Sequence, residues 1–132
     1  MKTWFKVFFW GFLFNLVWEQ LHSFLYLSYQ AGPITFFILA RAAVFDAAVI
    51  LVFIWLLRRL PEKFQRPWLL LVWGFLLAVG IEWWALATGR WVNQASMPII
   101  PLIHTGLTPT IQLAILSLLV YYLTFVRSAK KW

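Results

Sequence analysis

Four long runs of apolar residues dominate the pattern of this chain, at roughly residues 4–28, 34–57, 67–88 and 105–126. A helix needs about 20 apolar residues, at ~1.5 Å of rise each, to cross the hydrocarbon core of a bilayer. Residues typical of turns and loops separate the runs, at Gln30 to Pro33, Pro61 to Pro67 and Gly89 to His104. The pattern predicts one all-α domain over residues 1–132, an integral membrane four-helix bundle with an outer cap loop at 89–104.

The basic residues predict the orientation of this bundle. Nine of the eleven Lys and Arg residues lie on one side if the four spans alternate in direction: Lys2, Lys6, Arg58, Arg59, Lys63, Arg66, Arg127, Lys130 and Lys131. Short loops rich in Lys and Arg stay in the cytoplasm. We therefore expect a multi-pass protein of the cell inner (plasma) membrane, with both termini inside (N-in/C-in).

Composition supports a membrane protein and excludes several other classes of protein. Hydrophobic residues make up 64% of the chain and charged residues 11%, with a mean hydropathy of +0.83. The absence of Cys excludes disulfides and thiolate chemistry, and the net charge of +7 comes from residues that flank the spans. These cations suit lipid headgroups, so no nucleic-acid partner is expected. The first run is too long for a cleaved signal peptide.

Three of the four acidic residues lie inside the apolar runs: Glu19, Asp46 and Glu82. A charge in hydrocarbon costs several kcal/mol unless it is paired, neutralised or hydrated. On the first run, polar residues share one helical face, namely Asn15, Glu19, His22, Ser23 and Tyr26; the opposite face, with Phe9, Leu13 and Val17 among its residues, suits lipid. Counted from the outer ends, the buried polar residues of all four runs fall in the outer half of the bilayer, which predicts one shared polar pocket.

Charge balance within this pocket leaves two interpretations open. Arg41 can compensate one of the acids, and at least one of the remaining carboxyl groups is expected to hold a proton at neutral pH. A neutral acid beside an ionised one forms a proton donor and its counter-ion. The alternative is an Arg–carboxylate clamp that only fixes the register of the helices.

The candidate residues follow from this pocket. We expect Glu19, Glu82, His22 and Asp46 to be catalytic. The expected substrate-binding residues are polar side chains on the same faces and aromatic rings beside them: Asn15, Trp18, Tyr26, Arg41, Trp83, Trp84, Arg90, Trp91 and Gln112. Arg90 is expected to anchor the chain in the interface or to grip a headgroup or a pocket carboxylate.

The cap loop carries its own signals. Gly89 is expected to end the third helix in a left-handed conformation, and Thr108 to cap the fourth helix with Pro109 at its first position. The apolar segment from Met97 to Pro101 is expected to lie in the interface or to cover the pocket as a lid.

Other kinds of site are disfavoured. Glu19-x-x-His22 is half of the pattern of carboxylate-bridged di-iron bundles, but the second Glu-x-x-His is missing and His104 lies in a loop. We therefore expect no metal and no other cofactor. A nucleophilic Ser23 is disfavoured because adjacent residues diverge around a helix. An ion path is disfavoured because the inner halves of the runs are apolar.

The segment from Glu82 through Thr88-Gly89-x-Trp91-x-Asn93 to Pro101 resembles small membrane enzymes of carotenoid metabolism, namely the carotenoid hydratases and, more distantly, the lycopene-cyclase-type membrane domains. This resemblance covers about 20 of the 132 residues. Asn15-x-x-Trp18-Glu19 and Met97-Pro98…Gly106-Leu107-x-Pro109-x-x-Gln112 resemble a group of small, uncharacterised prokaryotic four-span proteins. The first resemblance implies acid-catalysed chemistry on an isoprenoid.

Two main functions remain open on this sequence. The first is an outer-leaflet enzyme that hydrates, cyclises or isomerises an isoprenoid or other apolar lipid by carboxylate acid–base chemistry. The second is a non-enzymatic subunit for lipid binding or assembly, and an ion-coupled transporter component is a third, weaker alternative. The expected partner is a membrane lipid or apolar small molecule. The sequence leaves open a homo-oligomer or another membrane protein as a further partner.

Overall fold

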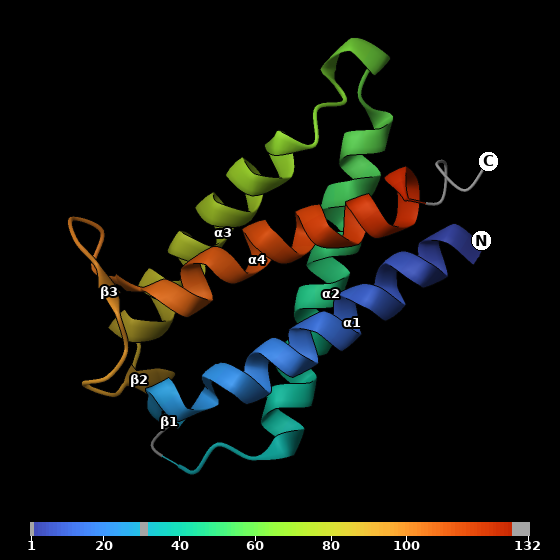
Figure 1. Ribbon diagram of the computed structural model, residues 1–132. Coiled ribbons are helices and arrows are strands. Elements are labelled where there is room, and N and C mark those ends of the chain that lie inside the picture. The colour runs from blue at the N-terminus through green and yellow to red at the C-terminus, as the bar shows by residue number, and fades with distance from the viewer. Residues whose placement is uncertain (1, 30–31, 128–132) are drawn as a thin grey trace.

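The computed structural model describes residues 2–29 and 32–127 (Figure 1). The predicted turn residues Gln30 and Ala31 and the basic residues Lys130 and Lys131 lie outside this range. The described chain is mostly helical, with four α-helices: α1 (Lys2–His22), α2 (Phe36–Arg59), α3 (Trp68–Ala87) and α4 (Leu107–Tyr121), the last continued by the π-helical turn Tyr122–Val126. The prediction of four helices is confirmed, and the bounds of the second, third and fourth agree with the apolar runs to within about two residues.

Three of the helices described here are long and apolar enough to cross a membrane. They are Phe36–Arg59, Trp68–Ala87 and Leu107–Val126, with mean hydropathies of 2.4, 2.0 and 1.7. This finding supports a multi-pass membrane protein. Helix α1 has 21 residues but is more polar than the others, because it carries Asn15, Glu19 and His22 within its second half.

The sequence predicts one helix over the full length of the first apolar run, but the structure has a shorter helix there. Helix α1 ends at His22, the 3-10 turn Ser23–Leu25 follows, and the chain then extends into β1 (Tyr26–Tyr29). The Ser23 hydroxyl donates to the carbonyl of Gln20 at 2.9 Å, a local bond that competes with helix continuation. The aromatic residues of β1 suit a strand, and a partner strand is available in the cap loop.

The cap loop contains the partner strands. The strand β2 (Trp91–Asn93) pairs antiparallel with β1, and β3 (Ile99–Ile100) pairs antiparallel with β4 (Thr105–Gly106). All four strands lie at the end of the molecule where α1 ends and α4 begins (Figure 1). Gly89, with φ of 71°, follows α3 in the predicted left-handed conformation, which glycine adopts without steric cost. The loop is therefore an ordered cap.

The helix ends that carry the basic residues lie at the opposite end of the molecule. The ring of Trp4 meets the ring of Phe125 edge-on at 6.1 Å, and the Arg58 guanidinium lies 4.8 Å from the centre of the same ring. The start of α1 and the ends of α2 and α4 therefore meet at one end, away from the strands. This arrangement agrees with helices that alternate in direction.

The basic end has an apolar core. Its buried side chains come from all four helices: Val7, Ile50, Ile54, Leu57, Leu70, Leu116, Val120 and Tyr121. Helices α3 and α4 approach each other so closely that a Cβ atom at Gly74 would lie 2.5 Å from the backbone nitrogen of Ala114. Small residues allow this kind of contact between membrane helices. No space for a ligand remains at this crossing.

Helix α1 presents two distinct faces, as its pattern predicts. Asn15, Glu19 and His22 are buried, whereas Phe9, Leu13 and Val17 on the other side are exposed. The polar face turns towards α2 and α4, where it forms one wall of a pocket.

Candidate functional site

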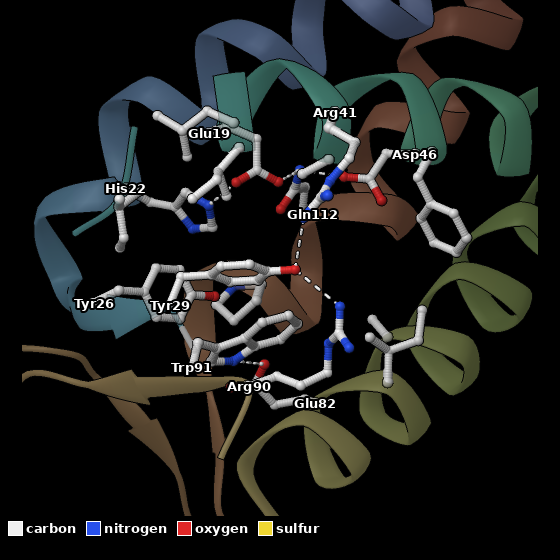
Figure 2. Close-up of a pocket in the computed structure, with 18 of the residues that line it drawn as sticks. Glu19, His22, Tyr26, Tyr29, Arg41, Asp46, Glu82, Arg90, Trp91 and Gln112 are labelled. Atoms are coloured by element: carbon white, nitrogen blue, oxygen red, sulfur yellow. Dashed lines mark hydrogen bonds and ion pairs between the residues drawn. The ribbon is translucent and has the colours of Figure 1, made fainter. Parts of the chain in front are cut away.

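A pocket of about 450 Å³ lies at the end of the molecule where α1 ends and α4 begins, and Figure 2 shows its lining residues. Residues from α1, α2, α3, α4, β1 and the start of the cap loop line it. The predicted site residues among them are Glu19, His22, Tyr26, Arg41, Asp46, Glu82, Trp84, Arg90, Trp91 and Gln112. The structure thus brings together side chains that are up to 93 positions apart in the chain.

Gln112 of α4 is the central hydrogen-bond donor of the polar wall. Its Nε2 atom donates to Asn15 Oδ1 at 2.9 Å, to Glu19 Oε1 at 3.0 Å and to Asp46 Oδ2 at 3.0 Å. The amide of Asn15 donates in turn to the carbonyl of Gly11 at 2.7 Å. One side chain of α4 therefore connects α1 with α2 at the depth of the acids.

The amide of Gln112 has fewer hydrogens than there are acceptor oxygens around it. The Gln112 amide nitrogen carries two hydrogens, but three oxygen atoms lie within 3.0 Å of it. The carboxyl groups of Glu19 and Asp46 are thus held beside each other around one amide nitrogen. Two carboxyl groups that share a site repel each other when both are ionised, and a proton shared between them relieves this repulsion. The geometry suits an acid pair that shares a proton.

His22 continues the polar chain towards α4. Its Nε2 atom lies 2.9 Å from Glu19 Oε2, and its Nδ1 atom lies 3.0 Å from the hydroxyl of Thr108. The ring also meets the ring of Tyr26 edge-on at 5.2 Å. Both nitrogens are engaged, so the imidazole is fixed in orientation and links Glu19 to the first turn of α4.

Glu82 is held apart from this pair by donors of the cap. Its Oε1 atom accepts from the backbone N–H of Gly106 at 3.2 Å, and its Oε2 atom accepts from the indole N–H of Trp91 at 3.1 Å. The side chain of Glu82 is 1% exposed. Both oxygens thus have a donor, and the carboxylate joins α3 to β2 and to β4.

Two arginines converge on one phenol at the edge of the pocket. Arg41 Nη2 and Arg90 Nη2 each donate to the hydroxyl of Tyr29 at 2.9 Å, and Figure 2 shows them approaching it from opposite sides. The Arg90 guanidinium also lies 4.8 Å from the centre of the Trp84 ring. The two cations therefore face each other across a single neutral group.

The expected pairing of Arg41 with a pocket carboxylate is absent. Across residues 2–29 and 32–127, the sole ion pair is the one between His22 and Glu19. Arg41 lies at an exposed position on the first turns of α2, where its guanidinium reaches Tyr29 rather than Asp46. The Arg–carboxylate clamp that the sequence leaves open is therefore not what fixes the register of these helices.

The remaining wall of the pocket is apolar. It is formed by side chains of α2, α3 and the segments beside them: Ile34, Ile38, Leu39, Ala42, Phe45, Ala78, Ile81, Pro109 and Leu113. The rings of Tyr26 and Trp91 meet edge-on at 5.8 Å and close the side next to the strands. The site thus combines a short polar wall with a larger surface suited to hydrocarbon.

Three expected site residues take other positions. Asn15 contributes through Gln112 rather than by lining the pocket. Trp18 packs against the apolar core, because the helical face that buries Glu19 turns its neighbour away. Trp83 is 52% exposed and donates to the carbonyl of Ile103 at 2.6 Å, so it fastens the cap loop instead.

Two expectations for the cap are also corrected. The segment that begins at Met97 does not cover the pocket, since Met97 is buried against Gly106 and Thr108 and β3 pairs with β4. The residue that caps α4 is Gly106. The hydroxyl of Thr108 is engaged with His22 and is not available as an N-cap.

Sequence reasoning missed Tyr29, which the two arginines share. The predicted first span ended at residue 28, so Tyr29 fell in the turn after it and was not considered as a site residue. The signal that was available is the spacing Tyr26-x-x-Tyr29 directly before a turn, together with Arg41 at the start of the next span. The apolar lining residues carried no signal of their own, because they do not differ from lipid-facing side chains.

Among the residues that the structure describes, no three His, Asp or Glu side chains are grouped so as to hold a metal ion. No protein-family model, curated protein or solved structure matches this chain. The geometry of the pocket is therefore the main basis for a function of this chain.

Proposed function

We propose that α1 also crosses the membrane, which makes the chain a four-span protein of the cell inner membrane with both ends in the cytoplasm. Its 21 residues correspond to about 30 Å of helix. Its start packs beside the end of α4 through Trp4 and Phe125, and Phe9, Leu13 and Val17 are exposed on its outer side. The pocket then opens in the outer half of the bilayer.

This orientation is open to a direct test, because the chain has no Cys. Single cysteines placed at Ser28 and at Lys63 should react from opposite sides of the membrane with a thiol reagent that cannot cross it. Labelling of both positions from the same side would contradict the proposed orientation.

Within this frame, the best-supported function is that of an acid–base enzyme acting on an isoprenoid or other apolar lipid. The observation that carries this proposal is the Glu19–Asp46 pair, which faces an otherwise largely apolar pocket. Protonation of an alkene carbon needs an acid in a poorly hydrated site, together with groups that stabilise the cation formed. Aromatic faces stabilise cations, and Tyr26, Trp84 and Trp91 line the same pocket.

The chemical steps balance without a cofactor. The protonated member of the pair transfers its proton to one carbon of a double bond, which leaves a carbocation on the other and a carboxylate on the enzyme. Loss of a proton from a neighbouring carbon completes an isomerisation. In a cyclisation, a second double bond of the lipid first attacks the cation and forms the ring bond, and the new cation then loses a proton from a neighbouring carbon. Addition of water followed by loss of a proton completes a hydration. In each case the released proton returns to the carboxylate pair.

The two groups of acids have different roles in this proposal. Glu19 and Asp46 exchange the proton, while His22 holds Glu19 in place through its Nε2 atom. Asp46 is the more accessible member, since it is only half-buried and Glu19 is buried. Glu82 positions Trp91 and the cap through its two hydrogen bonds. Glu82 and Trp91 belong to the segment that resembles carotenoid hydratases, and the choice of an isoprenoid among apolar lipids follows this resemblance.

A solvent-isotope experiment tests this function without knowledge of the product. The protein is placed in lipid nanodiscs that contain lycopene and is incubated in D₂O. All three reactions pass through a carbon that receives a solvent proton, so the recovered lipid should contain deuterium bound to carbon. Asp46→Asn should lower this incorporation by at least 100-fold, and Trp83→Phe, which changes a ring outside the pocket, should leave it intact.

A non-enzymatic role in lipid binding or assembly is the second candidate, and one observation favours it. Both oxygens of Glu19 and both oxygens of Glu82 already interact with protein groups. Acids held in this way can serve to join helices around a bound lipid. Co-purification of a lipid that stays chemically unchanged, with no uptake of deuterium, would decide for binding.

A further inference from the structure

Arg41 and Arg90 have no acidic partner where they meet. Each guanidinium donates to the hydroxyl of Tyr29 at 2.9 Å, and within the described part of the chain neither forms an ion pair with a carboxylate. Two cations that share one neutral acceptor repel each other, and the repulsion is strong where water is scarce. An anion placed between them would relieve it.

The geometry around the two arginines fits a phosphate group. Arginine donates from a planar fork that matches phosphate oxygens, and here two forks point at one place. Arg90 is held between the rings of Tyr29 and Trp84, at 5.7 and 4.8 Å from their centres. A guanidinium held in this way loses little further freedom when it binds an anion.

An apolar groove leads away from this pocket along α2. It has a volume of about 300 Å³ and is lined by Phe45, Ala48, Val49, Val52, Phe53 and Leu77. Phe45 lines both the pocket and the groove, so the two adjoin at its side chain. From residue 45 to residue 53 the groove follows about 12 Å of helix. Phe45 and Val52 are about half-exposed, which leaves the groove open to the side.

We infer that the pocket takes a lipid that ends in a phosphate, with the phosphate between Arg41 and Arg90 and the hydrocarbon tail in the groove between α2 and α3. Charge selects this occupant over a neutral lipid, because the arginines supply two positive charges at the edge of an apolar cavity. The acids Glu19, Asp46 and Glu82 face other donors of the pocket, namely Gln112, Gly106 and Trp91, and none of them forms an ion pair with either arginine. The inference deepens the proposed function by naming the headgroup of its substrate, and it rests on that function.

Binding of matched lipids to the purified protein tests this inference. Geranylgeranyl monophosphate and geranylgeraniol have the same tail and differ in the phosphate. Each is added to the protein in neutral detergent, and bound lipid is measured by native mass spectrometry. The phosphate should bind at least 10-fold more tightly than the alcohol. Equal binding of the two would overturn the inference.

Charge variants separate the site from general attraction to a basic protein. Arg41→Gln and Arg90→Gln should each weaken binding of the phosphate about 10-fold and leave binding of the alcohol unchanged. Arg59→Gln is the matched control, since Arg59 lies at the basic end of α2 over the ring of Trp55. A similar loss in Arg59→Gln would show surface attraction only, and would contradict the assigned site.

Two further experiments identify the molecule that occupies the site. Ala48→Phe fills the groove and should weaken binding of geranylgeranyl monophosphate, whereas Val44→Phe, at an exposed position outside the groove, should not. If inorganic phosphate displaces the bound lipid at equal concentration, the site belongs to a free anion and the lipid assignment is wrong. Equal effects of Ala48→Phe and Val44→Phe would also contradict the tail position.

This test is distinguishable from that of the proposed enzyme. Asp46→Asn should retain the preference for the phosphate lipid even if no deuterium reaches carbon in any variant, in which case the enzyme fails and the headgroup site stands. Dioleoyl phosphatidic acid compared with dioleoylglycerol repeats the measurement with another tail. A preference for both phosphates would support the headgroup site and leave the isoprenoid tail to be decided by the deuterium experiment.

Discussion

The two ends of this bundle use the same four helices in opposite ways. Towards the basic end, the side chains between the helices are apolar and buried, and directly beneath the pocket Gly74 of α3 lies against the backbone of Ala114 in α4. At the end with the strands, the helices hold Glu19, Asp46, His22 and a cavity of about 450 Å³. The helices are thus packed closely on one side of the crossing and leave a space on the other.

The largest expected effect comes from breaking the close crossing of α3 and α4. Gly74→Ala should reduce the free energy of unfolding by about 3 kcal/mol, because the new Cβ atom would meet the backbone of Ala114 and force the helices apart. Gly80→Ala is the matched control, since a Cβ atom there meets nothing within 4 Å. Reversible unfolding in mixed micelles measures both, and equal effects would show that the crossing does not hold the bundle together.

Loss of Gln112 should have the next largest effect, at the polar end. Gln112→Leu removes the donor shared by Asn15, Glu19 and Asp46, and we expect a loss of about 2 kcal/mol because buried acceptors are left without a partner. Gln65→Leu removes an amide that donates to the carbonyls of Arg58 and Leu60 at the end of α2, where water replaces it. The same unfolding measurement should show a smaller loss for this control.

A third comparison concerns the cap. Trp91→Phe removes the indole donor to buried Glu82 and should cost about 1.5 kcal/mol, as expected for a hydrogen bond to a charged group. Trp83→Phe removes an indole donor to the backbone carbonyl of Ile103 at an exposed position, and should cost about 0.5 kcal/mol. If Trp83→Phe costs as much as Trp91→Phe, Glu82 does not anchor the cap.

The smallest expected effect distinguishes the two groups of acids. Asp46→Asn supplies an N–H donor to Glu19 where a proton was shared, so the free energy of unfolding should change by less than about 1 kcal/mol. Glu82→Gln places an amide next to the donors of Gly106 and Trp91, where an acceptor is required, and should cost about 2 kcal/mol. Equal losses in these two variants would mean that Asp46 is an ionised acid without a shared proton.

Much of the helical framework was predictable because hydropathy and length act locally. The bounds of α2 and α3 follow from apolar runs that end at basic or glycine-containing segments, and the buried face of α1 follows from the spacing of Asn15, Glu19 and His22. The gathering of the acids followed from counting depth along each run. These inferences need no knowledge of contacts between distant segments.

The parts that the sequence did not reveal depend on such contacts. Helix α1 ends early because β1 pairs with β2, which lies about 65 positions away in the chain. Arg41 faces Tyr29 instead of an acid because that strand brings the phenol to the mouth of the pocket. Tryptophan is a common pocket residue, but Trp18 and Trp83 lie on faces of their helices that do not point into the pocket.

The pairing of β1 with β2 joins the two halves of the chain. One strand belongs to the connection between α1 and α2, the other to the connection between α3 and α4, and the register matches Tyr26 with Asn93 and Tyr29 with Trp91. Each half alone would leave the backbone groups of its strand unpaired near the membrane, which is costly. Residues 1–62 and 63–132, synthesised as separate polypeptides, should therefore recognise each other and reassemble, with the sheet as the specific link between them.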